Sequence, residues 1–217
     1  MTDDLRDLPL FPLNTVLFPS LPLPLHIFEE RYRLMIGSCI VTDNLFGVCL
    51  IKEGVEVGGP AEPFEIGTVA RISEVQREPD GRMNLMTFGV QRFKLLEITQ
   101  REPYLIGRVQ LLPAHDDVPA ADLVTDVADR LLRYLREVRR TSRLPDRGEL
   151  IADVDRLSYL AAATLGMPPR ERQTFLEIDA PTTRLREARD RLRRETDNAR
   201  LFGRELDTPN IGPFSRN

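Results

Sequence analysis

The sequence predicts an α+β fold in which a curved β barrel or sheet is followed by an α-helical bundle. Between residues 66 and 112, apolar and polar residues alternate as in strands, and Asp80-Gly81 is typical of a tight hairpin turn. Beyond a linker rich in proline and acidic residues, apolar residues instead recur every three or four positions. We therefore expect a β domain at residues 1–115, a helical bundle at residues 116–206 and a loose tail at residues 207–217.

Length and composition are those of a soluble globular chain. Of its 217 residues, 41% are hydrophobic and 29% are charged, which provides enough apolar material for a core. No apolar run approaches the roughly 20 residues that span a bilayer, and the acidic start MTDDLRD lacks the basic region of a secretory signal. With only two cysteines in the chain, a reducing, cytoplasmic location without membrane contact is expected.

The rest of the chain is organised around its opening stretch, residues 8–35. Apolar residues alternate there with proline or small polar residues up to Ile27, and a helical spacing begins at Phe28. Proline lacks the backbone N–H that a strand paired on both sides requires. We therefore expect two extended edge strands joined by the loop 14–20, followed by a helix from about residue 29 to Val41.

The next segments predict further strands. Residues 45–52 are a compact apolar run typical of a buried strand, and Gly58-Gly59-Pro60 predicts a loop. The arm that follows Asp80-Gly81 is too long for one flat strand, and Gly89 in its middle predicts a bend or bulge. Residues 104–112 complete a set of about six strands, which suits a small closed or half-closed barrel.

Helical periodicity marks the second half of the chain. Apolar spacing predicts helices at residues 124–141 and 150–165, Pro168-Pro169 opens a short helix to about Ile178, and Pro181 opens the last one. The last helix carries a narrow apolar seam, which suits packing against one or two neighbours. The seam consists of Leu185, Ala188, Leu192 and Ala199.

No motif for catalysis, metal binding or a cofactor is present, so we expect none of the three. The sequence contains no G-x-S-x-G elbow. His26 and His115 have no metal-ligand spacing with Cys39 and Cys49. The two cysteines form either a disulfide or two buried small hydrophobic residues. The second is expected, because free cysteine is among the most buried residue types.

Arginine-rich helices raise the alternative of RNA binding. Arginines recur every three or four residues between Arg130 and Arg143 and between Arg186 and Arg200. Acidic residues interleave with them at spacings that favour ion pairs within a helix. The net charge is −4, without the basic excess of a nucleic-acid-binding domain. Protein is therefore expected as the partner, and RNA binding stays the alternative.

The best candidate contact surface is the loop that leads into the first helix. If the loop is tight, its apolar side chains cannot all point inward, and an exposed apolar patch suits an extended, unfolded peptide. The alternative is that these side chains cap the barrel. The candidate peptide-binding residues are Val16, Leu17, Phe18, Leu21 and Leu23, rimmed by Glu29, Glu30 and Arg31.

Several short motifs resemble one known family when they are taken in order. They are LPLFPL at 8–13, Phe18-Pro19, LPLHIFEERY at 23–32, FGV at 46–48, GTVA at 67–70, DGR at 80–82 and GVQRF at 89–93. Over roughly residues 5–205, their order and spacing resemble the N-terminal substrate-binding domain of ATP-dependent Lon proteases. The resemblance implies a PUA-like β fold followed by a helical bundle, and a role in capturing unfolded or degron-bearing protein.

The chain also departs from the full protease. It contains no G-x-x-x-x-G-K-[ST] phosphate loop, and its two lysines, Lys52 and Lys94, lie in expected β structure rather than in a Ser–Lys dyad. The resemblance therefore implies a free-standing, non-catalytic recognition domain. Such a module would bind unfolded or hydrophobic protein segments and act as an adaptor in proteolysis, with a protease as a further partner.

Overall fold

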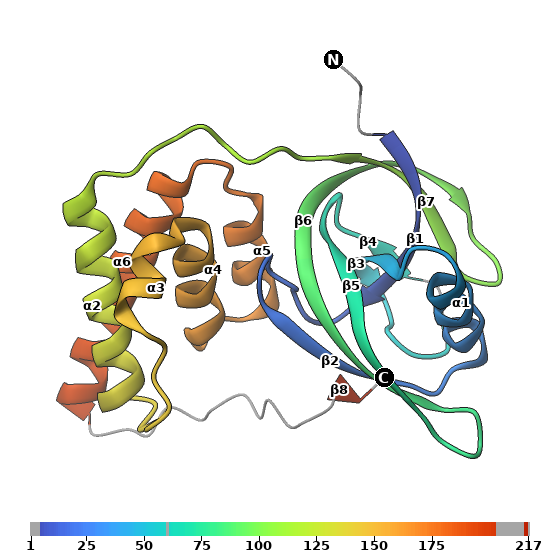
Figure 1. Ribbon diagram of the computed structural model, residues 1–217, viewed down its shortest axis with the longest axis horizontal. Coiled ribbons are helices and arrows are strands. Elements are labelled where there is room, and N and C mark those ends of the chain that lie inside the picture. Colours follow the sequence, from blue (N-terminus) through green and yellow to red (C-terminus); the bar gives the residue numbers. More distant parts are fainter. Residues whose placement is uncertain (1–4, 60, 203–214, 217) are drawn as a thin grey trace. The chain divides into compact units, whose positions relative to one another are not determined.

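The computed structural model describes residues 5–59, 61–202, 215 and 216, and it divides into two compact units (Figure 1). The first unit extends to Pro113, carries the β-strands and one helix, and includes Ser215 and Arg216. The second unit begins at Ala114 and is helical. The predicted α+β class, a curved barrel followed by helices, is confirmed. Residues 207–214 and 217 of the expected tail lie outside the described residues.

Five strands of the first unit close into a barrel. They are β1 (Leu5–Leu13), β3 (Leu45–Gly54), β5 (Ile66–Arg77), β6 (Met83–Gln100) and β7 (Leu105–Leu111). The pairing runs from β1 to β3, β5, β6 and β7 and returns to β1, with only the β1–β3 pair parallel. Closure leaves these strands few free edges, so most of their hydrogen bonds are made within the barrel.

Three short strands extend the barrel. β2 (Pro22–Ile27) pairs with the first half of β6, whose second half pairs with β7. On its other side β2 is joined by β8 (Ser215–Arg216), so the two described residues of the expected loose tail form a strand. β4 (Ala61–Pro63) pairs with the end of β3. β2 thus lies near the edge of the sheet, as its prolines predict.

Gly89 marks the bend in the long strand β6. The pairing of β6 with β5 shifts there, because Val90 is an extra residue between the pairs Val69–Gln91 and Ala70–Gly89. A Cβ atom at Gly89 would lie 2.2 Å from the carbonyl oxygen of Phe18. Glycine therefore lets the loop before β2 approach the strand, and the predicted bulge is confirmed.

β1 is not the edge strand that its prolines predict. It pairs with β7 as far as Leu10 and with β3 from Leu10 onward, so it lies inside the barrel. Pro9 faces Ile106 of β7, and Pro12 faces Cys49 of β3. Each proline thus lies in a stretch paired on one side, where the missing N–H can point to the unpaired side.

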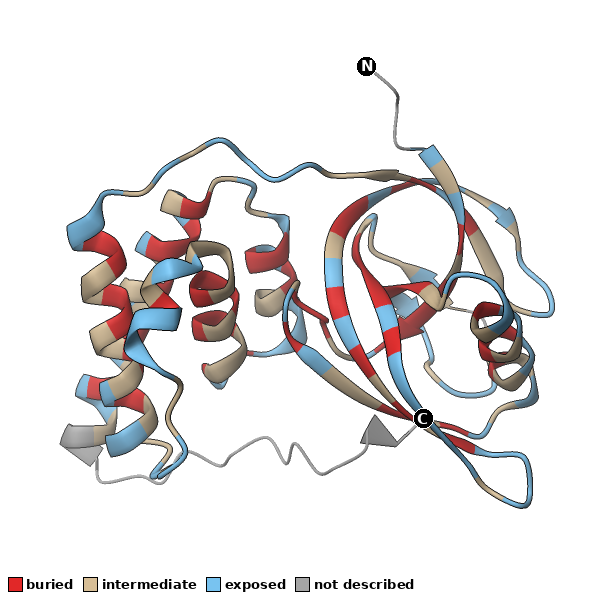
Figure 2. Ribbon diagram, viewed as in Figure 1, coloured by how far each residue is buried: buried red, intermediate tan, exposed pale blue. Residues whose placement is uncertain are grey.

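The helix α1 (Glu30–Val41) covers one part of the barrel core, close to its predicted bounds. Figure 2 shows buried residues along its inner side and along the barrel strands. One core cluster joins Tyr32, Met35 and Ile36 of α1 to Phe11 and Phe46 of the barrel. A second cluster gathers Leu8, Leu10, Phe93, Val109 and their neighbours.

The second unit contains α2 (Ala121–Glu137), α3 (Arg147–Ala152), α4 (Val154–Thr164), α5 (Pro169–Glu177) and α6 (Pro181–Phe202). In α6 the residues Leu185, Ala188 and Leu192 are buried and Ala199 is half-buried, and the helix packs against α2 and α4. The narrow apolar seam of α6 therefore packs against two neighbouring helices, α2 and α4, as predicted from the sequence. Among the described residues, no helix combines the length and apolar content needed to cross a bilayer.

The single helix predicted at residues 150–165 is wrong, because Asp153 divides it into α3 and α4. Its backbone has φ −120° and ψ 87°, outside the helical region. Its carboxylate accepts a hydrogen bond of 2.9 Å from the N–H of Arg156, in the first turn of α4. Aspartate is among the preferred N-cap residues, so the apolar spacing continues through a break in the helix.

Candidate functional site

The loop between β1 and β2 does not expose the apolar patch predicted for it. Val16, Leu17, Phe18 and Leu21 are each at most 9% exposed. The hydroxyl of Thr68 donates a buried hydrogen bond of 2.6 Å to the carbonyl oxygen of Leu17, which holds the loop onto the barrel. The exposed patch is therefore wrong for these four side chains. Leu17 belongs to the core cluster that joins α1 to the barrel, which agrees with the alternative that this loop caps the barrel.

Of the four other predicted site residues, Glu29 and Arg31 line a groove, whereas Leu23 and Glu30 lie outside its lining. Leu23, on β2, is half-buried against the core. Glu30 is exposed and forms an ion pair with Arg33, one turn further along α1. Glu29 and Arg31 instead line a groove. The structure thus brings together two of the eight predicted residues.

This groove has a volume of about 650 Å³ and lies beside the start of α1. Its lining consists of Pro12 of β1, of Glu29, Arg31 and Tyr32 around the start of α1, of Gly58, Gly59 and Ala61 in the glycine loop, and of residues 101–105 between β6 and β7. Tyr104 and Leu105 contribute apolar surface to the same groove as the charged Glu29 and Arg31. Its size is within the range of about 300–1,000 Å³ found for ligand sites, and we refer to it as the α1 groove.

Arg31 holds one wall of the α1 groove in place. Its Nε donates to Glu29 Oε2 at 3.1 Å, and its terminal nitrogens donate to the carbonyl oxygens of Gly59 at 3.3 Å and Glu56 at 3.4 Å. The guanidinium carbon lies 4.5 Å from the centre of the Tyr32 ring. All three guanidinium nitrogens are therefore directed at the chain itself, and they tie the glycine loop to α1.

Glu29 occupies the N-cap position of α1, but its side chain does not cap the helix. Its Oε2 accepts a hydrogen bond of 3.3 Å from the N–H of Gly58, which has φ 73°, a conformation that favours glycine. Its Oε1 is buried and has no hydrogen-bond partner among the described residues. A buried carboxylate oxygen in this state is uncommon in folded proteins.

Burial and nearby charges shift two pKa values at the α1 groove. Burial raises the pKa of the Glu56 carboxyl, and the charge of Glu29 raises it further. Burial also raises the pKa of Tyr32 to about 12, although the charge of Arg31 opposes that shift. Glu56 does not line the groove, but its carboxyl group lies close enough to Glu29 for the charge of Glu29 to act on it.

Sequence reasoning missed the segment 101–105. In the sequence, Tyr104 is predicted as the first residue of a strand. The neighbouring residues do not indicate that it packs against the core cluster that contains Tyr32. Only the return of β7 to β1 brings these parts of the chain together. The one local signal was Gly58-Gly59, because glycine pairs often mark a close approach of the backbone to another group.

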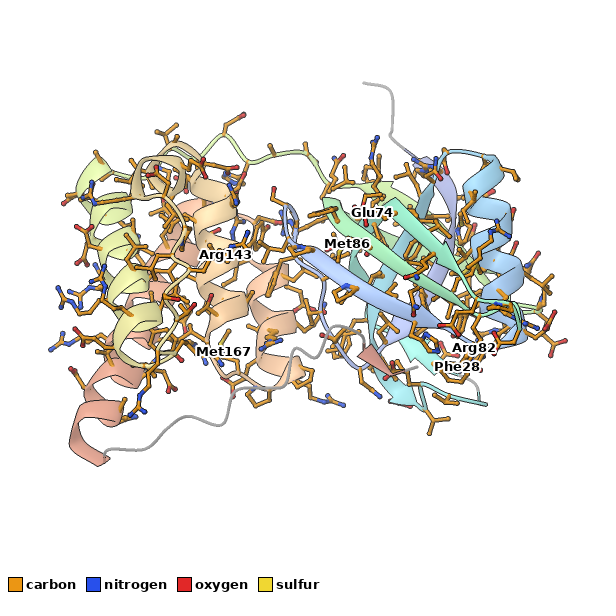
Figure 3. The ribbon with its side chains drawn as sticks, turned by 60° about the horizontal axis from the view of Figure 1, so that its bottom comes forward. Phe28, Glu74, Arg82, Met86, Arg143 and Met167 are labelled. Atoms are coloured by element: carbon orange, nitrogen blue, oxygen red, sulfur yellow. The ribbon has the colours of Figure 1, made fainter. Side chains whose placement is uncertain are left out.

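Exposed apolar side chains that sequence reasoning did not single out lie on the outer side of β6. Phe88 and Val90 are each 42% exposed. Met86 on the same strand pairs with Glu74 of β5, and Phe28 lies 37% exposed between β2 and α1 (Figure 3). Phe88 lies outside the lining of the α1 groove and therefore offers a matched control for it.

The cysteines are unpaired and buried, as expected for two small hydrophobic residues. Cys39 belongs to the core cluster under α1, and Cys49 belongs to the other cluster. Burial raises the pKa of each thiol to about 12. Within the described part of the chain, no three His, Cys, Asp or Glu side chains are placed to hold a metal ion. His26 instead lies with its Nδ1 2.7 Å from Asn84 Oδ1.

Several arginines of the helical unit form the ion pairs predicted for them. Arg130 donates to Asp126 one turn away at 2.8 Å, and Arg191 donates to Glu187 at the same distance. Arg193 lies 3.9 Å from Asp197, also at the i,i+4 spacing. These pairs reduce the positive charge that helices α2 and α6 present, which disfavours RNA as a partner.

Comparison with known proteins decides the family. A profile of the ATP-dependent protease La (LON) substrate-binding domain matches residues 7–194. The chain belongs to this family. The Lon protease of Desulfovibrio desulfuricans is 30% identical over 208 residues, which are 91% of this chain and 23% of that protein. A Lon protease of Anaeromyxobacter dehalogenans is 28% identical over 216 residues, 96% of this chain and 25% of that protein. The chain thus spans about a quarter of the length of these relatives.

Solved structures of Lon domains share the fold. A Lon N-terminal domain protein from Xanthomonas campestris matches with a TM-score of 0.66 and 30% identity, over 84% of this chain and 96% of that one. The N-terminal domain of a Mycobacterium avium complex Lon protease matches with a TM-score of 0.64 over 87% and 98%; at 19% identity, this likeness concerns the fold alone. The family predicted from the sequence motifs is confirmed, and the chain is a Lon substrate-binding module.

Proposed function

We propose that this Lon substrate-binding module binds unfolded or hydrophobic segments of other proteins in the α1 groove and carries out no chemistry on them. The observation that carries the proposal is the match of residues 7–194 to a substrate-binding domain. The α1 groove supports it, because Tyr104 and Leu105 offer apolar contact beside charged groups that can orient a peptide backbone.

The module then serves as an adaptor or sequestering factor for proteolysis in the cytoplasm, with a protease as a further partner. Two observations support this part. The relatives that contain a similar segment are Lon proteases. The two unpaired cysteines suit a reducing compartment.

Fluorescence anisotropy tests the binding claim. A labelled, unfolded peptide rich in apolar residues is titrated with the wild type, Tyr104→Ser and Phe88→Ser, after circular dichroism has shown that each variant is folded. We expect Tyr104→Ser to weaken binding by about tenfold or more, because central aromatic contacts dominate such interfaces. Phe88→Ser removes an exposed aromatic ring outside the groove and should bind as the wild type does. Equal affinity of all three proteins would remove the α1 groove as the site.

Two further assays test the rest of the proposal. Incubation with casein, with and without ATP, should leave the casein intact, and its degradation would contradict a non-catalytic role. A gel shift with RNA at increasing salt addresses the alternative function. A complex at low salt that is lost steeply as salt rises would support RNA binding.

A further inference from the structure

The strand β2 has an outer edge that is paired over only part of its length. On its inner side, all six residues of β2 pair with β6. On its outer side, the register joins Leu25 to Ser215 and His26 to Arg216, in parallel orientation. Within the described part of the chain, no other strand pairs with this edge. The edge therefore accepts one short strand and leaves the backbone groups of the first half of β2 for a longer one.

Backbone directions alternate along β2 and determine which groups face the outer edge. The carbonyl oxygen of Leu21, just before β2, accepts a hydrogen bond of 2.9 Å from the N–H of Gly89 in β6. Residues two apart in a strand direct their backbone groups the same way, so the odd-numbered residues of β2 point to β6. The outer edge is left to Pro22, Pro24 and His26. Because proline has no N–H, this edge presents three carbonyl oxygens and a single N–H, that of His26.

An edge of this kind depends on the N–H groups of the strand that is added to it. An extended, unfolded segment carries such donors along its whole length, and strand addition is a common way to bind one. The side chains of Pro22 and Pro24 lie on one face of β2, Pro22 exposed and Pro24 half-buried. Their rings offer apolar contact to alternate side chains of an added strand. The edge therefore suits an extended apolar segment that runs parallel to β2, as residues 215 and 216 do.

We propose that the outer edge of β2 is a strand-addition site, at which an extended, apolar client segment pairs parallel to β2 in place of residues 215 and 216. This inference rests on the proposed function and adds to it a second contact with the client, which the backbone makes. The two sites are close in the sequence, because β2 ends at Ile27 and Glu29 lines the α1 groove. Residues 215 and 216 compete with the client for the edge.

Two proline variants test whether residues 215 and 216 cover the edge. Because Leu25 directs its own backbone groups at β6, the residue opposite it, Ser215, pairs with the two neighbours of Leu25. The backbone groups of Arg216 point the other way. Ser215→Pro therefore removes an N–H that faces β2, and Arg216→Pro is the matched control, since its lost N–H faces away.

Hydrogen exchange of the His26 amide, followed by NMR, reports on this edge alone. We expect Ser215→Pro to speed this exchange about fivefold or more, as the loss of a hydrogen-bonded neighbour implies, and Arg216→Pro to leave it unchanged. Equal exchange in the wild type and Ser215→Pro would show that residues 215 and 216 do not cover the edge and would overturn the inference. Wild-type protection that is lost on dilution would assign the pairing strand to a second copy of the chain and would also overturn it.

Two peptides then test whether a client segment takes the edge. An unfolded apolar peptide, added in excess to Ser215→Pro, should slow the exchange of the His26 amide again. The same peptide with every backbone amide N-methylated keeps its side chains but has no N–H to donate, so it should leave the exchange fast. Exchange that stays fast with the unmethylated peptide would overturn the inference, and so would equal protection by the two peptides.

The outcomes separate this inference from the proposed function. If the unmethylated peptide binds the wild type and Tyr104→Ser weakens that binding, while the His26 amide of Ser215→Pro still exchanges fast, the proposed function stands and the strand-addition site is overturned. If the peptide binds neither the wild type nor Ser215→Pro, the inference and the proposed function are both overturned.

Discussion

Two glycines, one in the strand β6 and one in the helix α1, differ in the space available for a side chain. At Gly89, the carbonyl group of Phe18 occupies the space that a side chain would need. At Gly37, inside α1, a Cβ atom would meet nothing within 4 Å. Glycine therefore has opposite effects on stability at these two positions. One glycine is required by packing, and the other only lowers the stability of a helix.

Alanine substitutions at these two positions should change stability in opposite directions. Gly89→Ala should lower the free energy of unfolding by about 2–3 kcal/mol, because backbone atoms must move to admit the methyl group. Gly37→Ala should raise it by about 0.5–1 kcal/mol, the usual difference between the two residues within a helix. Urea unfolding followed by circular dichroism measures both. A Gly89→Ala protein as stable as the wild type would show that the loop is not held against β6 in this way.

Among the helices, α6 depends on a buried arginine near its start. Arg184 is 1% exposed, and its Nη1 donates to the carbonyl oxygens of Ile178 and Asp179, at 2.9 and 2.7 Å. Its Nε donates to the hydroxyl of Ser158 on α4, and its Nη2 pairs with Asp155. One side chain thus joins α4, the turn before α6, and α6 itself.

Replacement of Arg184 should destabilise the helical unit. Arg184→Leu removes the hydrogen bonds to the carbonyl oxygens of Ile178 and Asp179 and to the buried Ser158, so we expect a loss of about 2–4 kcal/mol of unfolding free energy. Arg186→Leu, two residues further along and exposed, should change stability by less than about 0.5 kcal/mol. Thermal unfolding at one protein concentration compares the two. Equal melting temperatures for the two variants would contradict the role given to Arg184.

Local sequence patterns predict where the helices and strands lie better than they predict which neighbours each helix or strand packs against. Alternation and the Asp80-Gly81 turn predict the strands, and helical spacing predicts α1 and α6. Prolines place β1 wrongly at an edge, because the strand changes partners between Pro9 and Pro12. Spacing alone joins α3 to α4, because a single capping residue, Asp153, leaves the apolar pattern unbroken.

The candidate site is predicted only in part, because barrel closure creates it. Of the residues predicted to rim the site around the start of α1, Glu29 and Arg31 line the α1 groove and Glu30 does not. Tyr104 and Leu105, which also line the groove, come from the far end of the β domain and reach it through the pairing of β7 with β1. The burial of Leu17 likewise depends on a core cluster whose members come from distant parts of the chain. These are long-range contacts that a local pattern does not contain.

For the whole molecule, buried acidic groups predict a loss of stability at high pH. Burial raises the pKa of Cys39, Cys49 and Tyr32 to about 12 each, from ordinary values of 9, 9 and 10. The unfolded chain therefore releases these protons first as the pH rises. The stabilisation is fully present below about pH 9 and is lost as the pH rises toward 12.

The free energy of unfolding should accordingly fall by more than about 2 kcal/mol between pH 8.5 and pH 11. Urea unfolding at several pH values measures the decline. The double variant Cys39→Ala plus Cys49→Ala lacks two of the three groups and should lose less stability over the same interval. A decline of the same size in both proteins would mean that the buried thiols are not its cause.

The central claim is that a Lon substrate-binding module captures unfolded protein segments in the α1 groove. An NMR titration of the isotope-labelled chain with an unfolded apolar peptide tests this most directly, because every backbone amide reports its own change. We predict that the largest chemical-shift changes fall at residues 29–32, 56–61 and 101–105. Binding with changes confined to other residues, such as the outer side of β6 around Phe88 or the helices of the second unit, would contradict the claim.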